Sequence, residues 1–139
     1  MKKFSFRLEK VLGLKDFKEQ EAKIDLGRAI SEMQIIQNQI EEIAKEKHKQ
    51  NKARSNTKDI YVLQSIEHYI NRLDLKKEEL LESLAKAQII VEEKRKVLQE
   101  AMKETKVLTK LKEKKREQHK KEELLETEKT LDDIGNRKF

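Results

Sequence analysis

Histidines and carboxylates are the residues of this chain that could carry chemistry, because both bind metal ions and transfer protons. The sequence has three histidines, His48, His68 and His119, and 27 Asp and Glu. It has no Cys, which excludes thiolate metal sites, a cysteine nucleophile and disulfides. No zinc-binding His motif, EF-hand loop or glycine-rich phosphate loop occurs. We therefore interpret each His as a solvated helix-surface residue and predict no metal and no cofactor.

The carboxylates alternate with lysines, which is typical of ion pairs between residues four apart on exposed helix faces. Catalysis needs a concave pocket with converging polar groups, and a pair of long helices provides neither. The sequence therefore predicts that the chain is not an enzyme and takes no small-molecule substrate.

The composition favours long helices over a compact globule. Of the 139 residues, 35% are hydrophobic and 43% are charged, with three Gly and no Pro to interrupt a helix. No apolar run exceeds four residues, which excludes a membrane span, and Arg7, Glu9 and Lys10 interrupt the start where a signal peptide would be apolar. We expect a cytosolic chain.

Apolar residues recur at alternating spacings of three and four along two segments, which predicts coiled-coil seams. Lys15 and Glu19 interrupt the first stripe, and the neighbouring Val11, Leu14 and Phe17 predict a local shift of the buried face there. The first stripe is Leu8, Leu12, Lys15, Glu19, Ala22, Leu26, Ala29, Met33, Ile36, Ile40 and Ile43. The second is Leu63, Ile66, Ile70, Leu73, Lys77, Leu80, Leu84, Ala87, Val91, Lys94, Leu98, Ala101, Thr105 and Leu108.

One break separates the stripes. Residues 45–58 contain one Ala and no larger apolar residue, and Ser55, Asn56, Thr57 and Asp59 suit a turn and a helix N-cap. The predicted fold is all-α: an antiparallel two-helix coiled-coil hairpin in a single elongated domain, residues 1–139. We expect a helix over about residues 4–54, a turn over about 55–59 and a helix over about 60–135.

In this hairpin Ile43 lies opposite Ile70 and Leu8 lies near Leu108. The second helix then extends beyond the first by roughly 25 residues, or about 40 Å at the helical rise. A parallel dimer of one continuous helix is the alternative, although it would carry the polar residues 51–58 through its seam.

The basic segment between Lys94 and Lys121 has twelve Lys or Arg against four Glu, which could attract phosphate. However, no aromatic residue occurs between Tyr69 and Phe139 for base stacking, and the acids recur along the helix. A basic coiled-coil scaffold or nucleic-acid-binding protein is therefore the alternative, and a protein whose role is contact with other proteins is favoured. Candidate contact residues outside the seams are Ile24, Ile30, Ile35, Tyr61, Tyr69, Leu75, Leu81, Ile89 and Ile90.

Both ends of the chain resemble the FliJ family. The opening FSFRLEKVLGLKDFKEQEAKIDLG has the family's aromatic–x–aromatic–Arg–Leu start, and KVLTKLKEKKREQHKKEELLETEKTLDDIGNRK has its basic stretch followed by an acid cluster and a short basic tail. The resemblance implies a component of bacterial flagellar type III protein export, needed for motility. It implies a fold similar to the central stalk of rotary ATPases. The stalk protein of an injectisome is the related alternative.

The resemblance also implies partners: the hexameric export ATPase FliI, the cytoplasmic domain of the export gate protein FlhA, and export chaperones. The chain would be cytoplasmic, peripheral to the inner membrane at the flagellar base, and would meet the membrane only indirectly through the gate. It would bind no nucleic acid. Glu46 and Gln50 stand where some relatives have aromatic residues.

Two sets of residues correspond to the family's contact positions. Those implied for the export gate are Gln39, Ile43, Tyr69, Ile70 and Leu73. Those implied for the ATPase ring are Phe4, Phe6, Arg7, Leu8, Leu111, Lys114, Lys115 and Arg116.

Overall fold

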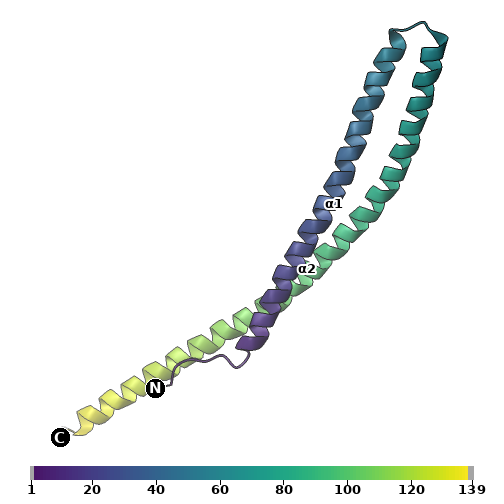
Figure 1. Cartoon of the computed structure of the whole chain (residues 1–139). Helices are drawn as coiled ribbons and strands as arrows, with labels where there is room; N and C mark the ends of the chain where they lie inside the picture. The colour runs from purple at the N-terminus through teal and green to yellow at the C-terminus, as the bar shows by residue number, and fades with distance from the viewer. Residues whose placement is uncertain (1, 138–139) are drawn as a thin grey trace. The chain divides into compact units, whose positions relative to one another are not determined.

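The computed structural model describes residues 2–137 and contains two helices (Figure 1). Helix α1 spans Glu9–Ser55 and helix α2 spans Ile60–Arg137. No strand occurs in residues 2–137. The predicted all-α class and the greater length of the second helix are confirmed. The predicted domain also included Met1, Lys138 and Phe139, which lie outside the described residues.

The chain divides into two compact units. The terminal unit contains the residues up to Ala22 and those from Leu98 onward, and the turn unit is Lys23–Val97. The helices run antiparallel in each. In the terminal unit Lys112 pairs with Glu9 and Lys15 pairs with Glu104. In the turn unit the pairs are Lys47 with Asp74 and Arg54 with Glu67. The intramolecular hairpin, and not the continuous helix of the parallel dimer, is therefore the observed fold.

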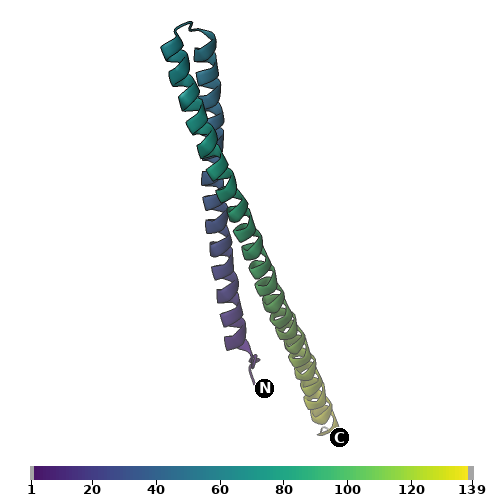
Figure 2. The ribbon, with the colours of Figure 1, turned by 90° about the vertical axis from the view of Figure 1, so that its right-hand side faces the viewer.

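A short turn joins the two helices (Figure 2). Short polar side chains form its hydrogen bonds. Helix α1 ends where the Ser55 hydroxyl donates to the carbonyl of Asn51. The Asp59 carboxylate accepts a hydrogen bond from the Tyr61 N–H at 3.0 Å, and the Thr57 hydroxyl accepts one from the Asp59 N–H at 3.3 Å. Asp59 thus caps one of the unpaired N–H groups at the start of α2.

Both predicted seams lie at the helix contacts: every position of the two stripes is buried or half-buried. The polar positions of the stripes also face the opposite helix, as the spacing predicts. Lys15 is half-buried and its ammonium group reaches the Glu104 carboxylate at 2.9 Å, because a lysine stem can lie along apolar surface while its charge points outward. The predicted local shift of the buried face is wrong: Leu14 and Phe17 are 62% and 61% exposed, and Val11 is exposed as well.

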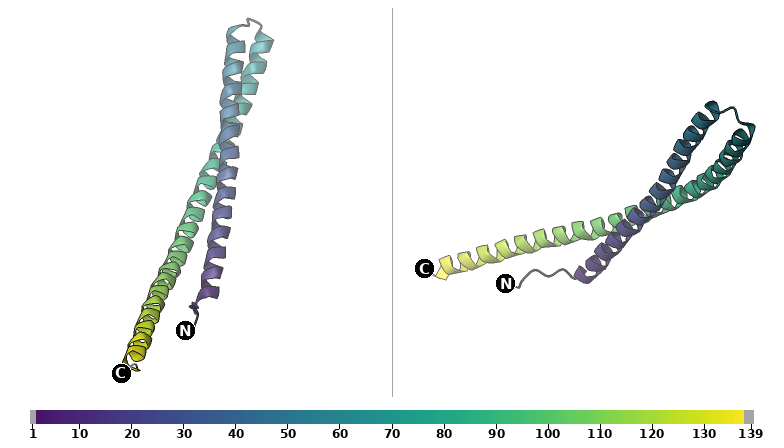
Figure 3. Two further views of the ribbon diagram at one scale, coloured as in Figure 1. Left: turned by 90° about the vertical axis from the view of Figure 1, so that its left-hand side faces the viewer. Right: turned by 45° about the horizontal axis from the view of Figure 1, so that its top comes forward.

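The first helix starts at Glu9, later than the expected residue 4. Residues 2–6 form a non-helical trace leading through a turn at Arg7 and Leu8 into α1 (Figure 3). Phe4, Phe6 and Leu8 are half-buried and alternate with exposed residues, which is the period of an extended chain. In a helix, residues 4 and 6 would point about 200° apart and could not both face α2.

No helix within residues 2–137 has a stretch long and apolar enough to cross a lipid bilayer.

Candidate interaction surfaces

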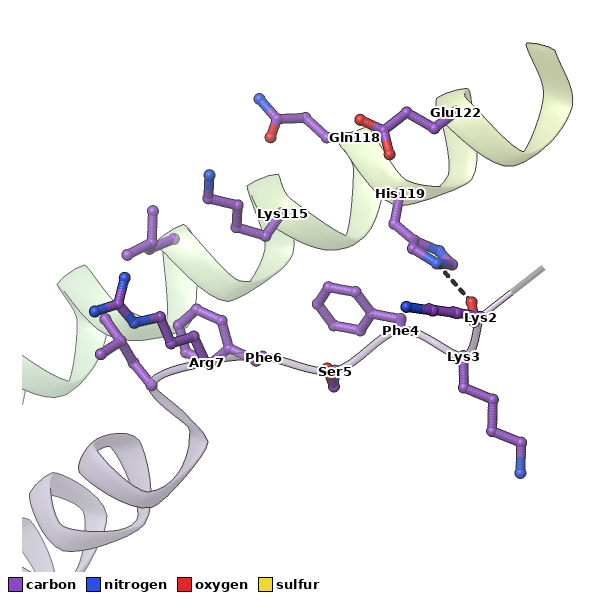
Figure 4. A pocket seen from close by; sticks show the side chains of 12 residues that line it. Lys2, Lys3, Phe4, Ser5, Phe6, Arg7, Lys115, Gln118, His119 and Glu122 are labelled. Atoms are coloured by element: carbon purple, nitrogen blue, oxygen red, sulfur yellow. Dashed lines mark hydrogen bonds between the residues drawn. The ribbon is translucent and has the colours of Figure 1, made fainter. Parts of the chain in front are cut away.

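The first candidate surface is a groove of about 580 Å³ in the terminal unit (Figure 4). It lies between residues 2–8 and one face of α2. Its apolar lining comes from Phe4, Phe6, Leu8 and Leu111, and its cations are Lys2, Lys3, Arg7 and Lys115, with Glu122 as its one acid. We call it the terminal groove.

Phe4 holds the N-terminal segment against α2. Its ring centroid lies 5.6 Å from the guanidinium carbon of Arg116, a cation–π distance, and 5.6 Å from the centroid of the His119 ring. His119 Nε2 is 3.0 Å from the carbonyl oxygen of Lys2 (Figure 4). Because a carbonyl only accepts, Nε2 is the protonated nitrogen of this contact. The interpretation of His119 as a merely solvated residue is therefore wrong: its ring is half-buried and fixes the segment.

Two cross-helix ion pairs occur in the same unit as the terminal groove. Lys112 Nζ lies 2.8 Å from a Glu9 carboxylate oxygen, and Lys15 Nζ lies 2.9 Å from Glu104. The hydrogen bond from Lys15, its positive charge and that of Lys18 lower the pKa of the Glu104 carboxyl below its ordinary value of 4.5, and partial burial opposes them. Glu104 therefore stays ionised further into the acid range in the folded chain.

The Lys15–Glu104 pair should make stability depend on pH. A carboxyl with a lowered folded-state pKa adds stability above its unfolded value, and that stability is lost as pH falls through the folded value. The thermal midpoint of Glu104→Gln should therefore lie slightly below that of the unsubstituted chain at neutral pH. The difference should disappear in acid. Glu113→Gln, on an exposed residue of the same unit, is the control; an equal pH-dependent difference there would contradict the assignment.

The second candidate surface, the turn groove, lies on both helices of the turn unit and has a volume of about 320 Å³. The Tyr69 hydroxyl lies 3.5 Å from the Glu46 carboxylate, and the Arg72 guanidinium carbon lies 5.6 Å from the centroid of the Tyr69 ring. These contacts orient Tyr69 at the groove. Its lining residues are Gln39, Glu42, Ile43, Glu46, Tyr69, Leu73, Lys76 and Leu80.

The structure brings most of the predicted contact residues together within their own units. Four of the five positions implied for the export gate line the turn groove; Ile70 is instead buried at 7% exposure. Of those implied for the ATPase ring, Arg116 contacts Phe4, Lys114 does not line the terminal groove, and the remaining six line it: Phe4, Phe6, Arg7, Leu8, Leu111 and Lys115.

Sequence reasoning missed Lys2 and His119 as members of the terminal groove. The alternation of Phe4, Phe6 and Leu8 is the one sequence signal for an extended segment, and it spans only three positions. The candidate contact residues outside the seams are exposed, except Tyr69, which is half-buried. Among residues 2–137, no three His, Asp or Glu side chains gather as a metal site requires.

The sequence matches the family model described as the flagellar FliJ protein over residues 4–139, nearly its whole length. No curated protein and no solved structure matches the chain. The matched range includes both helices and the N-terminal segment from Phe4. The chain therefore belongs to the FliJ family, a family of non-enzymatic components of flagellar protein export.

Proposed function

We propose that this chain is the central stalk of the export ATPase ring, that it contacts the cytoplasmic domain of the export gate, and that it escorts export chaperones. In the family's terms the ring is FliI and the gate is FlhA. The chain would work in the cytoplasm, peripheral to the inner membrane at the flagellar base. The observation that carries the stalk role is the terminal groove, where the two ends of the chain form one surface.

The chemistry of the terminal groove suits a stalk held in a protein ring. Phe4 and Phe6 offer aromatic anchors, the side-chain type that dominates binding energy at protein interfaces. The cations around them, Lys2, Lys3, Arg7 and Lys115, would meet acidic groups of the ring and orient the stalk, since charges at an interface rim steer more than they bind.

The turn groove suits the export gate because it presents side chains of both helices at once. Tyr69 and Leu73 provide half-buried apolar surface, and Gln39, Glu42 and Lys76 surround it with polar groups. An apolar centre with a polar rim is the usual build of a protein interface.

The basic segment of α2 bears on the nucleic-acid alternative. Lys112 is paired with Glu9, and Arg116 lies over Phe4. Two of its cations are thus engaged within the chain, which favours the protein-contact role. Binding to phosphate would weaken steeply with added salt, and absence of DNA or RNA retention at low salt would remove the alternative.

The stalk role is tested with the double variant Phe4→Ala, Phe6→Ala and the purified export ATPase. Loss of two aromatic anchors should weaken binding at least about tenfold, because each anchor of this type contributes at least about 1–2 kcal/mol. Isothermal titration calorimetry measures the affinity.

Phe17→Ala is the matched control, since Phe17 lies in the same unit, is 61% exposed and lies outside the groove. Its affinity should be unchanged. Unaltered ring binding by the double variant, or an equal loss in Phe17→Ala, would refute the assignment, as would full motility of a deletion strain.

A further inference from the structure

Three consecutive apolar side chains next to the hairpin turn are exposed. Ile60, Tyr61 and Val62 open α2 and are 67%, 82% and 42% exposed. Their backbone is fixed by the Asp59 cap, so the exposure belongs to an ordered helix start. We refer to residues 49–62 as the tip.

The arrangement of these three side chains is not that of a protein-docking stripe. Consecutive helical residues point about 100° apart, so Ile60, Tyr61 and Val62 spread around the end of the helix instead of sharing one face. A groove on a partner protein would bind helix residues that are three and four positions apart, because these share one face. A fluid medium that surrounds the helix end contacts all three.

The tip is also positively charged. Lys49, Lys52 and Lys58 are exposed, and none of them forms an ion pair within residues 2–137. Arg54 is held by Glu67. The one acid between residues 49 and 62, Asp59, accepts the hydrogen bond that caps α2. The tip thus contains three cations without an ion pair in the described chain and three exposed apolar side chains.

We propose that the tip binds the surface of a lipid bilayer that contains anionic lipid. Ile60, Tyr61 and Val62 insert among the headgroups, where a tyrosine keeps its ring in an apolar layer and its hydroxyl in water. Lys49, Lys52 and Lys58 lie at the lipid phosphates. The tip would thus touch the membrane directly, in addition to the indirect membrane contact through the gate. This inference is independent of the proposed stalk and gate roles.

The test is co-sedimentation of the full chain with two kinds of vesicle, phosphatidylcholine alone and phosphatidylcholine mixed with phosphatidylglycerol. The chain should sediment with the mixed vesicles and stay in the supernatant with the neutral ones. The triple variant Lys49→Gln, Lys52→Gln, Lys58→Gln should lower the partition coefficient on the order of 100-fold, since each cation near an anionic surface contributes about fivefold.

The matched charge control is Lys114→Gln, Lys120→Gln, Lys121→Gln, which removes the same charge from exposed positions of the terminal unit. Because only cations near the lipid surface make this contribution and these three lie outside the tip, the partition coefficient of the control should change less than about threefold. Equal losses in the two triple variants would mean attraction by net charge and would overturn the proposal for the tip.

Insertion is tested separately, because the chain has no Trp and one introduced Trp reports its own surroundings. Tyr61→Trp should shift its emission to shorter wavelength with the mixed vesicles. Leu75→Trp should not shift, although Leu75 lies in the same unit and is 63% exposed. Sedimentation with neither vesicle, or binding of Tyr61→Trp to the purified gate domain alone with no response to lipid, would overturn the proposal in favour of a protein partner.

Discussion

Replacing Tyr69 and Leu73 together by alanine is expected to weaken binding to the export gate's cytoplasmic domain at least about tenfold, as loss of an aromatic and an aliphatic anchor does at protein interfaces. Both side chains line the turn groove and are half-buried, so they are accessible to a partner. The affinity is measured by calorimetry, and circular dichroism of the free chain reports whether the helices persist.

Leu75→Ala is the control for this result, since Leu75 lies two residues further along α2, is 63% exposed and does not line the groove. We expect it to bind the gate normally. If the double variant lost helicity in proportion to affinity, Tyr69 and Leu73 would be seam residues only. If affinity did not change, the gate would bind elsewhere.

A second large effect is expected on stability. Val91 is the most buried residue of the described core at 3% exposure, whereas Ile89, two positions away, is 61% exposed. Val91→Asp places an unpaired carboxylate in the seam and should lower the free energy of unfolding by about 3 kcal/mol or more. Ile89→Asp should cost no more than about 0.5 kcal/mol, as surface substitutions do.

Urea denaturation followed by circular dichroism measures both variants. The pair shares one helix, one unit and nearly one side-chain shape, so helix propensity contributes little to the difference between them. Equal losses would contradict the assignment of residues 63–108 to a seam with Val91 at its centre.

The seams were predictable from the sequence because apolar residues spaced alternately by three and four fall on one face of a helix, where they pack against a second helix. The spacing holds even at Lys15, where an ion pair with Glu104 satisfies the charge that seemed to break the pattern. The predicted shift of the buried face towards Leu14 and Phe17 was wrong because it followed the apolar character of single residues and not the spacing of the whole stripe. Moving the buried face would have misaligned every seam residue after it.

The N-terminal segment could not be recovered from the same reasoning. Phe4, Phe6 and Leu8 fit a period of two, but three positions are too few to outweigh a helical pattern that continues for more than forty residues. The contact of Phe4 with His119 joins residues at the two ends of the chain, and no local signal encodes it. The terminal groove therefore needed the structure, whereas most of the turn groove followed from the register.

The antiparallel pairing has a consequence for the order in which the chain folds. The cross-helix pair Arg54–Glu67 closes a loop of 13 residues, whereas Lys112–Glu9 closes one of 103. From the unfolded chain, the longer closure costs about 2 kcal/mol more conformational entropy. The turn unit is therefore the favoured nucleus, and the terminal unit pairs after it. Opening the terminal unit regains this larger conformational entropy, so we expect it to open before the turn unit. The surface proposed for the ATPase ring therefore forms last and is lost first.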